Sequence, residues 1–158
     1  MRHALAMIAL FAPSVALADV ADIAPREGWR VIGTALAPAA LIEAVRAAVP
    51  AEGMAVVTEA GPTAAARARG IEIPENRVIG VFNNVFAVRI LNLSTAAMIE
   101  APVRFYVTGN ADGSASLSWK MPSFVFAPYV DDGGADLAAA AAELDAKFEA
   151  IAARATAQ

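Results

Sequence analysis

The sequence predicts a single domain in which helices and strands are mixed. Segments with apolar residues at helical spacing follow segments in which apolar and polar residues alternate, over residues 29–153. Residues 103–120 contain two such alternating segments joined by a short turn-like stretch, which is typical of a β-hairpin. No linker-like composition and no internal repeat interrupts the range, so we expect one folded unit.

The N-terminal residues predict secretion. A short basic start, Met1-Arg2-His3, precedes an apolar run that ends in Ala16-Leu17-Ala18, with small residues at the two positions that a signal peptidase reads. The apolar run is shorter than the roughly 20 residues of a membrane-spanning helix. We therefore expect a cleavable signal peptide over residues 1–18, a flexible leader over residues 19–28, and a periplasmic protein without a membrane segment after cleavage.

Composition excludes several kinds of chemistry. The chain has no cysteine, and its one histidine, His3, lies in the predicted signal peptide. Ser-His-Asp and Cys-His catalytic arrangements are therefore excluded from the mature chain, as are zinc sites of the Cys/His type. We expect no bound metal and no cofactor. The formal net charge of −4, with arginines scattered singly, argues against nucleic-acid binding.

Proline and glycine mark the ends of the first elements. Pro38 suits the first turn of a helix that Pro50 ends, and Gly70 closes a shorter helix that begins at Thr63. The predicted order is a strand over residues 29–34, a helix from Pro38 to Pro50, a strand over 54–58, a helix from Thr63 to Gly70, and a strand over 77–82.

The later elements are less regular. We interpret residues 84–99 as one helix that is capped near Asn83 or Asn84 and ended by the effect of Pro102. The aromatic segment 123–129 fits either an edge strand packed on the core or a lid over a pocket.

The last predicted helix covers residues 135–153. It pairs Glu143 with Lys147 on its outer face. Its buried face contains four large apolar residues: Leu137, Leu144, Phe148 and Ile151.

The predicted hairpin has a definite register. Asn110-Ala111-Asp112-Gly113 has the residues of a type I turn followed by a left-handed glycine, which places Asn110 opposite Ser114. Counting outward, Phe105 faces Trp119, so one side of the hairpin is apolar. A slip of one residue would mix the two sides, and the apolar pattern therefore selects this loop.

The other side of the hairpin predicts a candidate site. The same register sets Arg104 opposite Lys120, and two cations in this position repel each other. An anion is therefore expected nearby: either a carboxylate of the chain itself, such as Glu100 or one of the last helix, or an acidic ligand held by Arg104, Lys120 and the hydroxyl of Tyr106. The remaining alternative is a face that water solvates.

Two further candidate ligand-binding residues follow a buried strand. Asn83 and Asn84 stand where functional groups often lie in mixed folds, although asparagines at such positions are also common in turns and helix caps.

The stretch from Val78 to Pro122 resembles the DUF302 family, whose function is uncharacterised. The resemblance lies in a strand and turn, Val78-Ile79-Gly80-Val81-Phe82-Asn83-Asn84, and in Ala101-Pro102-Val103-Arg104-Phe105-Tyr106-Val107, Asp112-Gly113, Leu117-Ser118-Trp119 and Pro122. Phe82 and Asn84 depart from the glycine and proline of the family's turn.

This resemblance implies an α+β domain over residues 29–155, with helices packed on a curved, mainly antiparallel sheet similar to TATA-binding-protein-like folds. It also implies homodimers. Residues 100–129 look like an exported, proteobacterial branch of the family. No reaction and no catalytic residue come with the resemblance.

Two classes of function stay open. The first is a non-catalytic domain that binds a small ligand or a protein partner, with a structural subunit of a larger complex close to it. The second is an acid/base enzyme of the lyase or isomerase type that uses Glu100, Arg104 and Tyr106. Such catalysis works without histidine when burial shifts the pKa of a carboxylate or phenol toward neutrality.

Overall fold

The structure is a computed structural model that describes residues 16–17 and 20–157. The predicted signal peptide lies outside the described residues except for Ala16–Leu17. No helix in the described ranges is both long enough and apolar enough to cross a membrane.

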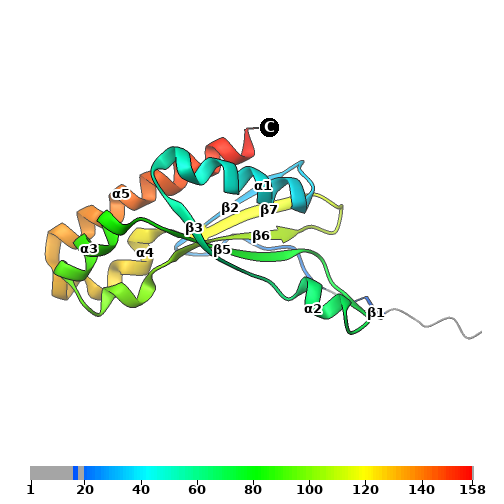
Figure 1. Cartoon of the computed structure of the whole chain (residues 1–158), viewed down its shortest axis with the longest axis horizontal. Helices are drawn as coiled ribbons and strands as arrows, with labels where there is room; N and C mark the ends of the chain where they lie inside the picture. Colours follow the sequence, from blue (N-terminus) through cyan, green and yellow to red (C-terminus); the bar gives the residue numbers. More distant parts are fainter. Residues whose placement is uncertain (1–15, 18–19, 158) are drawn as a thin grey trace, which may run out of the picture.

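A five-stranded sheet forms the centre of the domain (Figure 1). Its order is β2-β7-β6-β5-β3, and every neighbouring pair is antiparallel. The strands are β2 (Trp29–Thr34), β3 (Ala55–Ala60), β5 (Asn76–Phe82), β6 (Val103–Gly109) and β7 (Ala115–Lys120). A separate parallel pair joins β1 (Ala16–Leu17) to β4 (Ile71–Glu72). The mainly antiparallel sheet that we expected is confirmed.

Helices cover one face and one end of this sheet. In Figure 1, α1 and α5 lie along one face, and α5 also packs against α3 and α4. The α-helices are α1 (Pro38–Ala48), α2 (Thr63–Arg67), α3 (Asn84–Leu93), α4 (Pro122–Phe126) and α5 (Val130–Thr156), and the 3-10 helices are η1 (Val49–Glu52), η2 (Ala97–Glu100) and η3 (Ala127–Tyr129). The backbone of α5 is not helical at Gly134, so its regular part begins where the sequence predicts.

The hydrophobic core lies between the sheet and the helices. Phe105 stacks on Phe148 of α5, with ring centroids 4.4 Å apart, and meets Trp119 edge-on at 5.5 Å. All three side chains are fully buried or nearly so. The four apolar residues predicted for the buried face of the last helix are also buried, which confirms that face.

The predicted hairpin register is confirmed. Phe105 pairs with Trp119 in the β6–β7 ladder, and the amide of Asn110 donates to the carbonyl of Ser114 at 2.8 Å. Gly113 has φ +86°, the left-handed conformation that the loop requires.

The single helix predicted over residues 84–99 is wrong, because the chain forms α3 and then η2. Ser94 has an extended backbone and interrupts the helix. Its hydroxyl accepts from the amide of Ala97 at 3.1 Å and donates to Asp132 at 2.8 Å. The extended backbone of Ser94 thus ends α3, while its hydroxyl bonds to the first residue of η2 and to α5, a local hydrogen-bonding role that competes with helix continuation.

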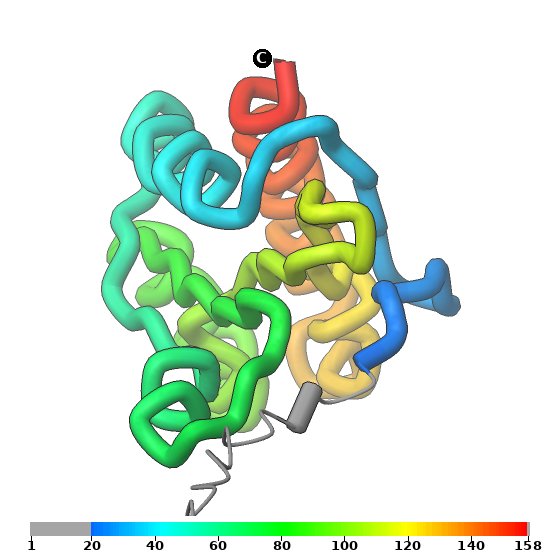
Figure 2. Tube along the Cα trace, turned by 90° about the vertical axis from the view of Figure 1, so that its right-hand side faces the viewer, coloured from blue at the N-terminus to red at the C-terminus, as the bar shows by residue number. Residues whose placement is uncertain are grey.

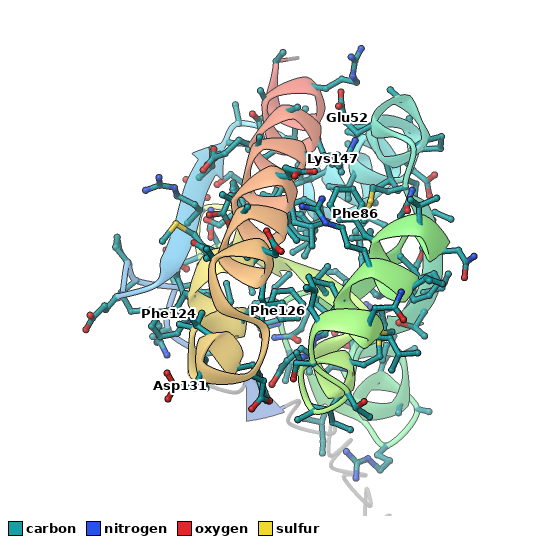
Figure 3. The ribbon with its side chains drawn as sticks, turned by 90° about the vertical axis from the view of Figure 1, so that its left-hand side faces the viewer. Glu52, Phe86, Phe124, Phe126, Asp131 and Lys147 are labelled. Carbon is teal, nitrogen blue, oxygen red and sulfur yellow. The ribbon has the colours of Figure 1, made fainter. Side chains whose placement is uncertain are left out.

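The edge strand considered for residues 123–129 is also wrong. The segment is helical, as α4 and η3, and β2 and β3 occupy the two edges of the sheet. Pro122 and Pro128 each stand in a first helical turn, where a proline loses no hydrogen bond. Figure 3 labels the two phenylalanines of α4, and Phe126 is 3% exposed whereas Phe124 is 44% exposed.

The predicted pair of Glu143 and Lys147 does not form, because both side chains have partners on other elements. Glu143 accepts from Arg89 of α3, with both oxygens 2.9 Å from Nη1. The Nζ of Lys147 donates to the carbonyl of Glu52 at 2.9 Å and lies over the ring of Phe86 (Figure 3).

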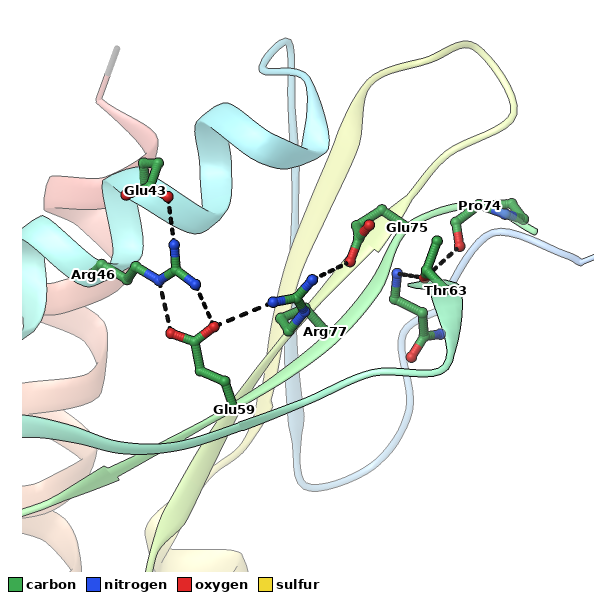
Figure 4. A network of polar contacts seen from close by, with 8 residues as sticks. Glu43, Arg46, Glu59, Thr63, Pro74, Glu75 and Arg77 are labelled. Atoms are coloured by element: carbon green, nitrogen blue, oxygen red, sulfur yellow. Dashed lines mark hydrogen bonds and ion pairs between the residues drawn. The ribbon is translucent and has the colours of Figure 1, made fainter. Parts of the chain in front are cut away.

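A network of charged side chains ties α1 to edge strand β3 and to β5 (Figure 4). The Nε of Arg46 donates to Glu59 at 2.7 Å, and Arg46 also contacts Glu43. Arg77 bridges Glu59 at 3.3 Å and Glu75 at 3.0 Å. The hydrogen bond from Arg46 holds the pKa of Glu59 below its usual value, despite partial burial of the carboxylate.

Candidate functional site

Strand alternation divides β6 and β7 between two faces. Phe105 and Trp119 belong to the core, so Arg104, Tyr106 and Lys120 take the opposite side of the sheet. These three side chains line a cavity of about 340 Å³, here named the open-face cavity. Glu100 of η2, Trp29 of β2, and Val78 and Asn76 of β5 also line it. The cavity therefore brings together all four residues that the sequence predicted beside the hairpin.

Arg104 has an internal partner. Its Nη2 lies 4.0 Å from Oε2 of Glu100, and the Arg104 side chain is 56% exposed. The hydroxyl of Tyr129 donates to the other Glu100 oxygen at 2.8 Å. This hydrogen bond raises the pKa of Tyr129, as does its partial loss of contact with water. A carboxylate of the chain thus lies near Arg104, as one of the alternatives expected, but its contact with the guanidinium is long.

Lys120 has a different environment. Its Nζ lies 5.7 Å from the centroid of the Trp29 ring. Within residues 16–17 and 20–157, no carboxylate forms an ion pair with it. Among the described residues, the Lys120 charge therefore faces an indole ring rather than a carboxylate.

Tyr106 contributes a hydroxyl to the cavity wall. That oxygen accepts a hydrogen bond from Nδ2 of Asn76. Because a phenol both accepts and donates, its own hydrogen is free for a further acceptor. The cavity thus offers an ammonium group, a guanidinium group and a hydroxyl donor from two paired strands.

Asn83 and Asn84 lie elsewhere. The Oδ1 of Asn83 accepts from the amide of Phe86 at 3.0 Å and caps α3, while its Nδ2 donates to the carbonyl of Gly53 at 2.7 Å. Asn84 is the exposed first residue of α3. Neither residue lines the open-face cavity, and capping is the role that the structure describes for Asn83.

The sequence did not indicate Trp29, Asn76 or Val78 as site residues. Asn76 and Val78 reach the cavity because β5 pairs with β6, where Val78 lies opposite Tyr106. Trp29 reaches it because β2 pairs with β7, where it lies opposite Lys120. These pairings join strands far apart in the chain, and no local pattern encodes them.

The described residues contain no cluster of three or more histidine, cysteine, aspartate or glutamate residues suited to a metal ion. The chemistry available in the open-face cavity is that of a carboxylate, a guanidinium, an ammonium and a phenol. These groups can bind an anion, and Glu100 with Tyr106 could also exchange protons with a bound molecule.

Comparisons with known proteins identify the family. "Domain of unknown function DUF302" matches residues 32–155. The crystal structure of an uncharacterised conserved DUF302 protein from Bacillus stearothermophilus is similar, with a TM-score of 0.73 and 18% identity. That similarity covers 82% of this chain and 99% of the other, and at this identity it supports the shared α+β fold alone. None of the curated proteins compared with the chain matches it. The chain belongs to the DUF302 family.

Proposed function

We propose that this DUF302 domain binds a small anionic molecule in the open-face cavity. The observation that carries the proposal is the placement of Lys120 and Arg104 in one cavity with a single carboxylate, Glu100, near only one of them. An anion placed between the two cations would relieve their repulsion and accept charge-assisted hydrogen bonds from both.

The cavity wall suits a small organic molecule better than a bare ion. Val78, Val103 and Val125 supply apolar surface, and Trp29 and Tyr106 supply aromatic surface. Mostly apolar walls with a few polar groups that converge are typical of ligand sites, and a volume of about 340 Å³ lies in their usual range. The ligand class is accordingly an organic anion.

An acid/base enzyme is the second candidate, and one observation favours it. Glu100 is held by the Tyr129 hydroxyl at the edge of the cavity that Arg104 and Tyr106 also line. Slow chemical conversion of a bound anion would establish this function instead. The conversion rate should then be lost in Glu100→Gln and retained in the control variant Arg30→Met, which lies outside the cavity.

The cellular context is proposed from the sequence. Residues 1–18 support export to the periplasm by a cleavable signal, and residues 19–28 would then form the N-terminal leader. A homodimer and a protein partner stay predictions. Native mass spectrometry of protein purified from the periplasm of its own host would report the mature N-terminus, the subunit number and any retained ligand together.

Calorimetric titration with benzoate tests the binding proposal. We expect measurable affinity in the wild type and a loss of at least about tenfold in the double variant Arg104→Met/Lys120→Met. Arg30→Met is the matched control, because it removes an exposed positive charge that pairs with Glu149 outside the cavity. Equal affinity in the double variant and the wild type would refute the proposal.

A further inference from the structure

A second cavity lies next to the first on the same face of the sheet. Its volume is about 400 Å³, and it lies between the leader, from Val20 to Arg26, and strands β5 and β6. The leader runs close to the β6–β7 loop (Figure 2), where Asp22 accepts a hydrogen bond from the amide of Ala111 at 3.0 Å. We name this hollow the leader cavity.

The two cavities are continuous in their walls. Trp29, Asn76 and Tyr106 line both of them. The hydrogen bond from Asn76 to the Tyr106 hydroxyl therefore stands at their junction. A molecule long enough to pass these residues would extend from the side of Lys120 into the leader cavity.

The charges of the two cavities differ in sign. Arg104 and Lys120 outnumber Glu100 in the open-face cavity. The leader cavity instead contains the carboxylates of Asp22 and Glu75. Its positive group, Arg26, lies over the Trp29 ring at the junction, 5.2 Å from the ring centroid.

The two carboxylates of the leader cavity already have partners in the chain. Asp22 accepts from the β6–β7 loop, and Glu75 accepts from Arg77 at 3.0 Å. The remaining wall includes Ile23, Ile73 and Pro74, which offer apolar contacts. Beyond Arg26 and the residues at the junction, the side chains of the leader cavity are apolar or acidic apart from Thr108, whose hydroxyl has no partner in the described residues. This end therefore favours an uncharged, mainly apolar group and disfavours a second anion.

We propose that the ligand is an elongated amphipathic monocarboxylate. Its carboxylate lies between Arg104 and Lys120, and its apolar body passes Trp29 and Tyr106 into the leader cavity. The inference rests on the proposed function, because it takes the same cationic pair as the anchor, and it adds the class, length and direction of the ligand.

A chain-length series tests the inference. Butanoate, octanoate and decanoate are titrated calorimetrically at concentrations where they remain monomeric. Each methylene that becomes buried is expected to strengthen binding by up to about fourfold, so decanoate binds much more tightly than butanoate. Decanedioate, which has a second carboxylate at the apolar end, is expected to bind at least about tenfold more weakly than decanoate.

A variant of the leader locates the apolar body. Ile23→Asp places a carboxylate in the leader cavity and is expected to weaken decanoate binding at least about fivefold while leaving butanoate binding unchanged. Ile99→Asp is the matched control, because Ile99 is an exposed isoleucine of η2 that lines neither cavity. Far-UV circular dichroism checks that both variants fold.

The outcomes separate the two proposals. Equal affinity for butanoate and decanoate, with both lost in Arg104→Met/Lys120→Met, would overturn the amphipathic ligand and leave anion binding intact. Decanoate binding that is unaffected by this double variant would overturn both. Decanoate binding that needs the cationic pair and weakens in Ile23→Asp alone supports both.

Discussion

Replacing Phe105 tests whether one face of β6 stabilises the core while the other forms the ligand site. Phe105 is fully buried, and its ring has two aromatic neighbours, Phe148 at 4.4 Å and Trp119 at 5.5 Å. The side chain of Tyr106, the next residue, lies on the opposite face in the wall of the open-face cavity. Phe105 and Trp119 also border that cavity, but their rings pack in the core. Substitutions at these adjacent positions should therefore affect different properties of the protein.

The expected cost follows from the contacts of Phe105. Phe105→Leu keeps most of the apolar volume and loses two aromatic pairs, each worth about 0.5–1.5 kcal/mol, so the free energy of unfolding should fall by about 1–3 kcal/mol. Phe105→Ala leaves a cavity as well and should cost about 3–5 kcal/mol. Since small domains are stable by only about 5–15 kcal/mol, the leucine variant is the safer measurement.

Urea unfolding followed by far-UV circular dichroism measures these differences. Tyr106→Phe is the control on the open face and is expected to change the free energy of unfolding by less than about 1 kcal/mol while altering ligand binding. A Phe105→Leu variant as stable as the wild type, or a Tyr106→Phe variant that is destabilised more than Phe105→Leu, would refute the assignment of the two faces.

Two further predictions concern ionisable groups. Because the hydrogen bond from Arg46 lowers the pKa of Glu59 in the folded protein, its stabilising effect is present above about pH 4.5 and is lost as the pH falls through the lower, folded-state value. Glu59→Gln should therefore lower the free energy of unfolding by about 1 kcal/mol at pH 7 and make it less dependent on pH below 4.5. Urea unfolding at several pH values measures both effects. A variant whose stability falls with acid as steeply as that of the wild type contradicts this prediction. The pKa of Tyr129 is raised by its bond to Glu100, so its contribution to stability is present below pH 10.0 and is lost as the pH rises through the folded-state value. The chain has only two tyrosines, so comparing ultraviolet titrations of the wild type and Tyr129→Phe isolates this group, and a Tyr129 titration at or below pH 10.0 contradicts the prediction.

Features encoded by neighbouring residues could be predicted from the sequence. The hairpin register follows from the turn at residues 110–113 and from alternation on either side, and it alone brings Arg104, Tyr106 and Lys120 to one face. The helix from Pro38 and the buried face of the last helix follow equally from spacing and from proline and glycine.

Features that depend on distant partners could not be predicted. Ser94 breaks a helix, and the acceptor of its hydroxyl, Asp132, lies on another element. Glu143 prefers Arg89 of α3 to the lysine one turn away. The walls of the candidate site have the same origin, because Trp29 reaches it through the pairing of β2 with β7 and Asn76 through the pairing of β5 with β6, and both pairings join residues far apart in the chain.

In β6 and β7, alternate residues face the core and the cavity, and this arrangement determines which mutations the domain tolerates. The exposed residues Arg104 and Lys120 on the cavity side can be replaced without disturbing the packed interior, so related chains could acquire different ligands on one scaffold. A one-residue insertion within either ribbon would instead turn cations inward and aromatic rings outward together. The length of the connecting turn at residues 110–114 therefore matters for folding and for ligand selection together. Among related sequences, insertions and deletions in this region should be much rarer than substitutions.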